Sequence, residues 1–234
     1  MTQIDAARAG ICTPEMKAVA AKEYKTPEEI RDAVAKGIIA IPANINHTTL
    51  DPEGVGEGLR TKVNVNLGIS GDLMDEEMEL EKARIALELG AEGIMDLSNH
   101  GKTREFRRKL LAMSSAMIGT VPMYDAIGYL EKPLIGITAQ DFLDVIRAHA
   151  EDGVDFVTVH AGMNRRVIES FKETGRLMNI VSRGGSLIFA WMEATGNENP
   201  FYEHYDEVLE ILHEYDVTRS EERRVGKECR SRWS

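Results

Sequence analysis

The chain has 234 residues, of which 43% are hydrophobic and 29% are charged, and its formal net charge is −11 at pH 7. This length and composition fit a single α/β domain with one sizeable core. The acidic balance argues against nucleic acid or an anionic membrane surface as a partner. Residues 1–10 lack the apolar segment of a signal peptide, and no long apolar run follows, so we expect a cytoplasmic protein.

The first 61 residues predict a helical segment that ends in a polar loop. Thr-Pro steps at 13–14 and 26–27 are typical helix starts, and Thr26 with Glu29 has the form of a capping box. An extended run over 38–42 then leads into Ala-Asn-Ile-Asn-His at 43–47. We expect Asn44, Asn46 and His47 either to close a site from outside or to cap one another.

From residue 62 onward, hydrophobic strands alternate with helices. Strands are expected over 62–66, 93–97, 117–121, 155–160 and 179–182, and a sixth starts at 215–218. The helix over 75–89 is expected to place Met78, Ile85, Ala86 and Leu89 on one buried face. We predict an α/β fold with an incomplete (β/α)8 TIM-like barrel over 62–218, about five units long, because eight units typically need about 250 residues.

The last sixteen residues, 219–234, differ in character from the rest of the chain. They show no helical or strand periodicity, and they match the translation of a common sequencing-library adapter residue for residue. A solvated basic tail is the alternative interpretation. We therefore treat 219–234 as a non-native tail and expect the natural protein to continue beyond residue 218. Without the tail, Cys12 is the only cysteine, so the sequence predicts no metal or cluster motif in this chain.

Short polar motifs end each expected strand, and in a barrel such ends converge on one rim. Ser182-Arg183-Gly184-Gly185 offers a hydroxyl, a guanidinium and open backbone N–H groups, which suit a phosphate or carboxylate unless the glycines only form a turn. His160 is either a proton-transfer or hydrogen-bonding group or a satisfied core histidine.

Other side chains at these strand ends are weaker candidates. Asn64 and Asn66 share one strand face, and an amide can read a ring nitrogen or a hydroxyl. Met95 is more often a core residue, and Asp96 either contacts a ligand or caps a helix. Tyr124 either presents its hydroxyl to the mouth of the barrel or packs. By contrast, His149 is expected to pack on a helix stripe.

Taken together and in this order, the motifs over residues 2–218 resemble the phosphomethylpyrimidine synthases, radical S-adenosylmethionine enzymes of thiamine biosynthesis. The matching segments are Thr-Pro-Glu-Met at 13–16, Ile-Pro-Ala-Asn-Ile-Asn-His at 41–47, Asn-Val-Asn-Leu-Gly at 64–68, Ile-Met-Asp-Leu-Ser at 94–98, Ile-Gly-Thr-Val-Pro-Met-Tyr at 118–124, Val-His-Ala-Gly at 159–162 and Ile-Val-Ser-Arg-Gly-Gly at 180–185.

The resemblance implies a carbon–carbon lyase that converts 5-aminoimidazole ribotide into 4-amino-5-hydroxymethyl-2-methylpyrimidine phosphate. It also implies a [4Fe–4S] cluster, S-adenosylmethionine and zinc as cofactors, and a homodimer. The substrate contacts carried over by motif are Asn66, Met95, Tyr124, His160, Ser182, Arg183 and Gly184, with Asn44, Asn46, His47, Asn64 and Asp96 as secondary candidates. No residue of this chain is assigned a catalytic role.

The chain departs from the family's pattern in one respect. The family's metal-binding histidines and its Cys-x-x-Cys-x-x-x-x-Cys motif are absent, so we expect this chain to be inactive alone. Two alternatives stay open. One is 5-hydroxybenzimidazole synthase, which uses the same ribotide to make a cobamide ligand. The other is a non-catalytic module that binds a phosphorylated ligand, although exposed edges of a half-barrel would make it aggregate.

Overall fold

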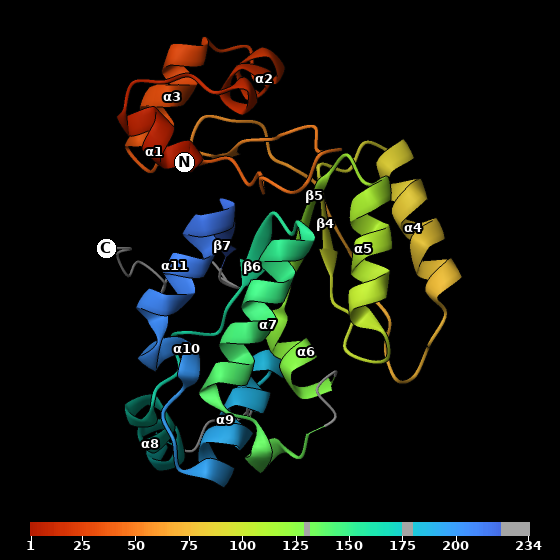
Figure 1. Cartoon of the computed structure of the whole chain (residues 1–234), viewed down its shortest axis with the longest axis vertical. Coiled ribbons are helices and arrows are strands. Elements are labelled where there is room, and N and C mark those ends of the chain that lie inside the picture. The colour runs from red at the N-terminus through yellow and green to blue at the C-terminus, as the bar shows by residue number, and fades with distance from the viewer. Residues whose placement is uncertain (129–131, 175–179, 221–234) are drawn as a thin grey trace.

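The computed structural model describes residues 1–128, 132–174 and 180–220, and it has a mixed α/β architecture. Three short helices form a layer at one end of the molecule, and a parallel sheet with its covering helices forms the rest (Figure 1). The described part of the chain contains no helix with both the length and the apolarity needed to cross a membrane.

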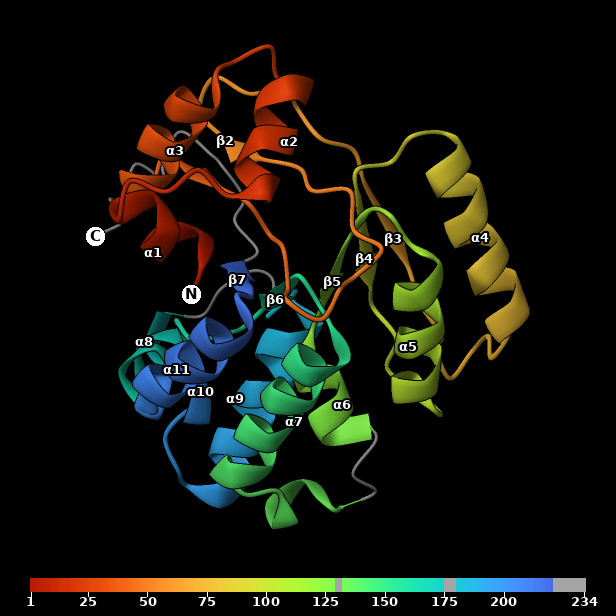
Figure 2. The same ribbon diagram turned by 45° about the horizontal axis from the view of Figure 1, so that its top comes forward.

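The N-terminal layer consists of α1 (Gln3–Arg8), α2 (Pro14–Lys22) and α3 (Pro27–Ala35), seen together in Figures 1 and 2. Each helix follows a threonine whose hydroxyl accepts a backbone N–H bond from the third helical residue. This confirms the predicted starts at 13–14 and 26–27. An antiparallel pair, β1 (Ile39–Ala40) and β2 (Val55–Gly56), lies beneath these helices, which have a hydrophobic cluster of their own.

The central sheet is parallel, and its strands are ordered as they occur in the chain. It comprises β3 (Asn64–Leu67), β4 (Gly93–Asp96), β5 (Met117–Thr120), β6 (Phe156–Thr158) and β7 (Thr218–Ser220). Connections that always advance in one direction are those of a barrel, whereas doubly wound sheets reverse. The α/β class is thus confirmed. Over the described residues the sheet ends at β3 and β7 without closing, so the barrel stays a prediction.

Helices cover one face of this sheet and its carboxyl end (Figure 1). The covering helices are α4 (Glu76–Glu88), α5 (Thr103–Met113), α6 (Pro122–Gly128), α7 (Ala139–Asp152) and α11 (Tyr205–Tyr215). At the carboxyl end lie η1 (Leu134–Gly136), α8 (Arg165–Thr174), α9 (Arg183–Thr195) and α10 (Pro200–Glu203). Phe142 meets Trp191 and Phe201 edge to face at 5.5 and 5.3 Å, which fixes α7, α9 and α10 to one another.

The predicted strand over 179–182 is wrong in its described part, 180–182. Val181 is 62% exposed, and Ser182 is the N-cap of α9, with its Oγ accepting the N–H of Gly185. Because β6 pairs directly with β7, the sixth expected strand occupies the fifth place in the sheet. It also begins at Thr218 rather than at 215 and includes Arg219 and Ser220, the two described residues of the predicted tail.

The predicted buried face of α4 is correct at Ala86 and wrong at its other three positions. Met78, Ile85 and Leu89 are 41, 44 and 82% exposed, whereas Ala83 and Ala86 are buried. The helix packs beside β3, which is an edge strand, and beside α5. These two neighbours do not cover the side of the helix that carries Met78, Ile85 and Leu89.

Candidate functional site

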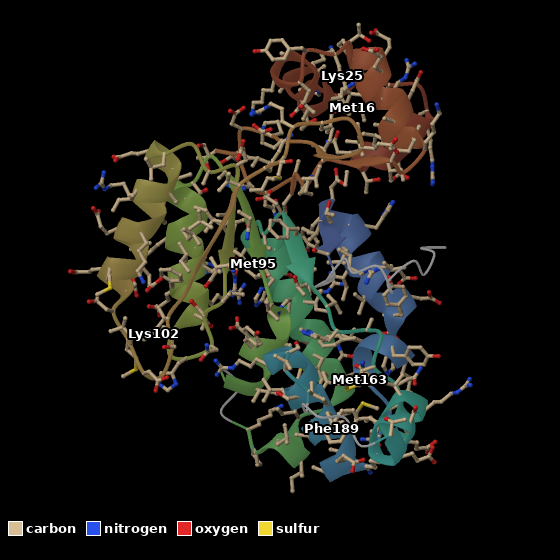
Figure 3. The ribbon with its side chains drawn as sticks, turned by 180° about the vertical axis from the view of Figure 1, so that it is seen from behind. Met16, Lys25, Met95, Lys102, Met163 and Phe189 are labelled. Atoms are coloured by element: carbon tan, nitrogen blue, oxygen red, sulfur yellow. The ribbon has the colours of Figure 1, made fainter. Side chains whose placement is uncertain are left out.

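A cavity of about 670 Å³ lies against the face of the sheet that the helices leave open. Alternate residues of each strand share a face, so Asn64 and Asn66 of β3 point to this cavity while Leu67 is buried on the other side. Met95 contributes the neighbouring position on β4, directly opposite Asn66 in the parallel register. Figure 3 shows Met95 near the centre of the molecule, between the N-terminal helices and the α8–α9 end.

The two asparagines of β3 contact each other. Nδ2 of Asn64 donates a hydrogen bond to Oδ1 of Asn66 at 3.0 Å, which fixes the orientation of the Asn66 amide. The structure thus brings two predicted substrate contacts, Asn66 and Met95, and one secondary candidate, Asn64, to one polar wall.

The amino-terminal end of the cavity carries cations that are already neutralised. Arg60 and Lys62 line this floor. Lys62 forms an ion pair with Glu23, the backbone N–H of Arg60 donates to Glu23 at 2.8 Å, and the Arg60 guanidinium lies 3.6 Å from Glu92. With Glu53 also within 4 Å of both cations, the floor offers no net positive charge to an anion.

A second group of predicted residues meets at the start of α9, beyond the carboxyl ends of the strands. Nε2 of His160 lies 3.0 Å from Oγ of Ser182, the N-cap of this helix. A Cβ atom added to Gly184 would lie 2.2 Å from Cε1 of His160. The imidazole ring approaches the first turn of α9 so closely that only glycine fits at position 184. This contact explains why the motif has a glycine there.

Arg183, the first residue of α9, completes this group. Its Cζ atom lies 5.5 Å from the ring centroid of Tyr124 on α6, a cation–π distance, and its Nη2 donates to Oδ1 of Asn99 at 3.0 Å. A guanidinium at the N-terminus of a 13-residue helix adds its charge to the positive end of the helix dipole. This end of the sheet can therefore attract an anion, unlike the neutralised floor.

Asp96 lies on the opposite face of β4 from Met95. It is buried, and its Oδ1 accepts the N–H of Ser98 at 2.9 Å. Burial raises the pKa of Asp96 to about 6, although the bonds from Ser98 and the charge of Arg107 oppose the shift. The structure does not bring Asp96 to the cavity wall formed by Asn66 and Met95.

A buried polar network beneath α5, α6 and α7 was not singled out by any sequence motif. Nη1 of Arg107 donates to Asp125 and its Nη2 to Asp152, both at 2.9 Å. His149 bridges Asp125 and Thr120 at 2.8 Å each. Because Asp125 is the next residue after Tyr124, this network fixes the start of α6. The sequence did contain one indication of this network. In Pro-Met-Tyr-Asp at 122–125, an acidic residue directly follows Tyr124, a candidate substrate contact.

The charge states of this network follow from its burial. Burial and the charge of Arg107 lower the pKa of His149 to about 4, so the imidazole is neutral at pH 7. Burial opposes ionisation of Asp125, but His149 and Arg107 outweigh it and bring the pKa to about 2. Since a carboxylate only accepts, Nε2 of His149 donates to Asp125 and Nδ1 accepts from the hydroxyl of Thr120. His149 is buried, as expected, but it is a hydrogen-bonding group.

The other secondary candidates lie at the amino ends of the strands. Nδ2 of Asn44 donates to the carbonyls of Ala150 and Val154 at 2.7 and 2.9 Å, and its backbone N–H donates to Asp155 at 3.0 Å. Nδ2 of Asn46 donates to the carbonyl of Glu151. His47 bridges Asp155 and the carbonyl of Ser114 at 2.7 and 3.1 Å. The hydrogen-bond partners of these side chains precede β5 and β6 in the chain. The loop 43–47 therefore lies at the amino ends of the strands, opposite to Tyr124 and Ser182 at the carboxyl ends.

The described residues offer no ligand set for the zinc ion or the iron–sulfur cluster that the sequence resemblance implied. Among them there is no group of three or more His, Cys, Asp or Glu side chains that could hold a metal ion. Cys12, partly buried in the N-terminal layer, is the one cysteine of the described ranges. A cluster bound by three thiolates therefore has no place in this part of the chain, and no chemical step is assigned to such a group here.

A parallel sheet with polar side chains gathered beyond the carboxyl ends of its strands is an arrangement on which many α/β enzymes build their sites. A family model described as the Radical SAM ThiC family matches residues 2–230, so the chain belongs to this family. A phosphomethylpyrimidine synthase of Alkaliphilus metalliredigens (strain QYMF) is 61% identical over 229 residues, which cover 98% of this chain and 52% of the relative.

Further relatives carry the same name. The phosphomethylpyrimidine synthase of Alkaliphilus oremlandii (strain OhILAs) is 61% identical over 219 residues, covering 94% of this chain and 50% of the relative. That of Pelotomaculum thermopropionicum is 58% identical over 229 residues, covering 98% and 52%. The chain thus spans about half the length of the curated relatives it matches.

Proposed function

We propose that the full-length protein is a thiamine pyrimidine synthase, which converts 5-aminoimidazole ribotide into 4-amino-5-hydroxymethyl-2-methylpyrimidine phosphate. The names of the relatives and the radical S-adenosylmethionine family support this reaction and its lyase class. The iron–sulfur cluster, S-adenosylmethionine and zinc belong to the proposal, with their ligands outside the described residues. This chain then contributes substrate binding rather than the cofactor chemistry.

The distribution of charge carries this proposal. The cations at the floor of the cavity are neutralised by three carboxylates, whereas Arg183 lies outside the cavity lining, at the start of α9 beyond the carboxyl ends of the strands. A ribotide has a phosphate at one end and an uncharged aminoimidazole at the other. We assign the phosphate to Ser182, Arg183 and Gly184, and the imidazole to the wall formed by Asn66 and Met95. Tyr124 and His160 would then contact the ribose or the phosphate.

The domain organisation is part of the same proposal. Residues 1–61 form a helical segment that closes the amino-terminal end, and 62–218 form part of a (β/α)8 barrel whose remaining units lie elsewhere in the protein. The separate hydrophobic clusters around Ile30 and around Ile118 support this division. Residues 219–234 are proposed to be non-native. The homodimer and the cytoplasmic location stay predictions.

Product analysis of the full-length protein tests the function. Sequencing the gene beyond codon 218 supplies that protein and shows whether the codons for 219–234 are those of an adapter. After anaerobic reconstitution, we expect the ribotide to give the pyrimidine phosphate, identified by mass spectrometry. A benzimidazole product would establish the cobamide pathway instead. Ribotide binding without turnover would indicate the non-catalytic module.

A binding measurement tests the assignment of the phosphate. Arg183→Ala is expected to weaken ribotide binding by about 100-fold in calorimetry, because a charge-assisted contact to the phosphate is lost. Arg60→Ala at the floor is the matched control and is expected to change the affinity by less than about 3-fold, since its charge is already compensated. Equal losses in the two variants would contradict the proposed orientation.

A further inference from the structure

Asn99, in the loop after β4, has a backbone that is fixed by the neighbouring strand segment. Its N–H donates to the carbonyl of Ile69 at 3.0 Å, two residues beyond the bond from Leu97 to Leu67 at 2.8 Å. Between them, the buried Ser98 accepts the N–H of Ile69 on its Oγ at 2.9 Å. The parallel pairing of the two segments therefore continues past the ends of β3 and β4 as far as Asn99.

The side-chain amide of Asn99 also has a defined orientation. Its Nδ2 donates to the carbonyl of Leu97 at 3.3 Å, and its Oδ1 accepts from Nη2 of Arg183 at 3.0 Å. Exchange of the two ends would bring the NH₂ group against a guanidinium, where two donors oppose each other. The amide is therefore held with its oxygen toward Arg183, and that guanidinium is held between Asn99 and the ring of Tyr124.

Asn99 also connects the two halves of the site along one strand face. Met95, Leu97 and Asn99 occupy alternate positions of an extended segment, so they face the same side, and Met95 and Leu97 line the cavity. Four residues of extended chain span about 13 Å, of the order of the length of a mononucleotide. Asn99 thus lies between the end of the cavity and Arg183.

We propose that Asn99 is a positioning residue for Arg183, holding its guanidinium over Tyr124 and toward the anionic end of a phosphorylated ligand that extends into the cavity. This inference rests on the proposed function. An amide suits the task because its oxygen orients the guanidinium without neutralising it. A carboxylate in the same place would form an ion pair with Arg183 and compete with the phosphate of the ligand.

A double-mutant cycle in the full-length protein tests this role. The variants are Asn99→Ala, Asn99→Asp and Arg183→Ala, with each Asn99 variant also combined with Arg183→Ala. Calorimetry with the ribotide gives the affinity, and steady-state kinetics gives KM and kcat. The exposed Asn197, in the α9–α10 loop, supplies matched controls as Asn197→Ala and Asn197→Asp.

We expect Asn99→Ala to weaken ribotide binding by about 10-fold and Asn99→Asp by about 100-fold, with KM raised and kcat changed by less than about 3-fold. In the Arg183→Ala background, either Asn99 variant is expected to have an effect of less than about 2-fold, because the group that Asn99 positions is gone. The Asn197 controls are expected to match the parent protein.

Several outcomes would overturn the inference. Additive losses in the Arg183→Ala background would show that Asn99 acts independently of the arginine, for example by supporting the loop. An Asn99→Asp variant that binds as well as Asn99→Ala would show that the added charge does not reach Arg183. Absence of ribotide binding by the parent protein would instead refute the proposed function, so the two failures are distinguishable.

Discussion

The two ends of the parallel sheet use the same residue types for different purposes. At the amino end, Asn44 and His47 are buried, and their hydrogen bonds go to backbone carbonyls and to Asp155. At the carboxyl end, Asn99 and His160 contact side chains of the α9 start, Arg183 and Ser182. The first end is a closed polar core that holds the N-terminal segment, and the second is a rim on which side chains orient one another.

This difference shows how a polar motif at the end of a strand can be interpreted. A buried asparagine whose donors are all used by the backbone is committed to the fold. A half-buried asparagine that orients a cationic side chain leaves that cation able to bind a ligand. Stability and ligand binding should therefore respond to substitutions at opposite ends of the strands.

The largest effect on stability is expected from Asp155→Ala. The carboxylate accepts the N–H of Asn44 at 3.0 Å, and its Oδ2 accepts from His47 and from the N–H of Ile118, both at 2.7 Å. Removing it leaves several buried donors without an acceptor. The expected loss is about 3–5 kcal/mol of unfolding free energy, measured as a shift in the urea midpoint.

An exposed carboxylate at the other end supplies the control for this substitution. Asp72, in the loop after β3, is exposed, so Asp72→Ala should change the unfolding free energy by less than about 0.5 kcal/mol. Similar losses in the two variants would remove the distinction between the two ends.

A second prediction concerns ligand binding at the rim. Gly184→Ala places a Cβ atom 2.2 Å from the present position of Cε1 of His160, so the ring or the first turn of α9 must shift. We expect ribotide affinity to fall by about 10- to 100-fold with a change of less than about 1 kcal/mol in stability, since the half-buried imidazole of His160 can move away from the added methyl group. Calorimetry and a urea titration measure the two effects.

Gly162→Ala is the matched glycine substitution for this test. No atom lies within 4 Å of the position that its Cβ would occupy, so its effect on the affinity should be small. If Gly162→Ala weakens binding as much as Gly184→Ala, the contact between His160 and α9 is not what the glycine protects.

Local signals in the sequence predicted most elements, because they act over a few residues. The threonine caps and adjacent prolines fixed the helix starts, and short hydrophobic runs located β3, β4, β5 and β6. The expected strand over 179–182 failed in its described part, 180–182, because pairing is decided by long-range competition, and β7 occupies the place beside β6. No local pattern shows which of two candidate strands, tens of residues apart, pairs with a given strand of the sheet.

The sequence proposes candidate site residues one by one, but it does not show how they are arranged. The motifs identified the rim residues from Tyr124 to Gly184, and the structure brings them together at α9. They left open whether the loop of Asn44 and His47 closes the site or is capped within itself. The loop lies at the amino ends of the strands, where the N–H of Asn46 donates to Oδ1 of Asn44. Asn99 was missed because its importance comes from a side chain 84 positions away. Chemistry at a strand end is visible in the sequence, whereas the partner that orients it is not.

The smallest effect is expected from the pH dependence contributed by His47. Burial lowers the pKa of this imidazole, but the hydrogen bond and charge of Asp155 and the carbonyl of Ser114 outweigh it, so the pKa is raised above 6.5. Both neighbours of the ring are acceptors, which requires two N–H groups. A raised folded-state pKa contributes stability that is fully present below pH 6.5 and is lost as the pH rises through the folded value.

His47→Gln removes this titration while keeping a polar side chain. The difference in unfolding free energy between the parent protein and the variant should therefore be largest near pH 6 and should shrink toward pH 9, as the imidazole loses its second proton in the folded protein. Urea titrations at pH 6, 7.5 and 9 measure this difference. A difference that stays constant or grows with pH would show that His47 is neutral in the folded protein. The closed polar core at the amino end would then have to be held by hydrogen bonds without a buried charge.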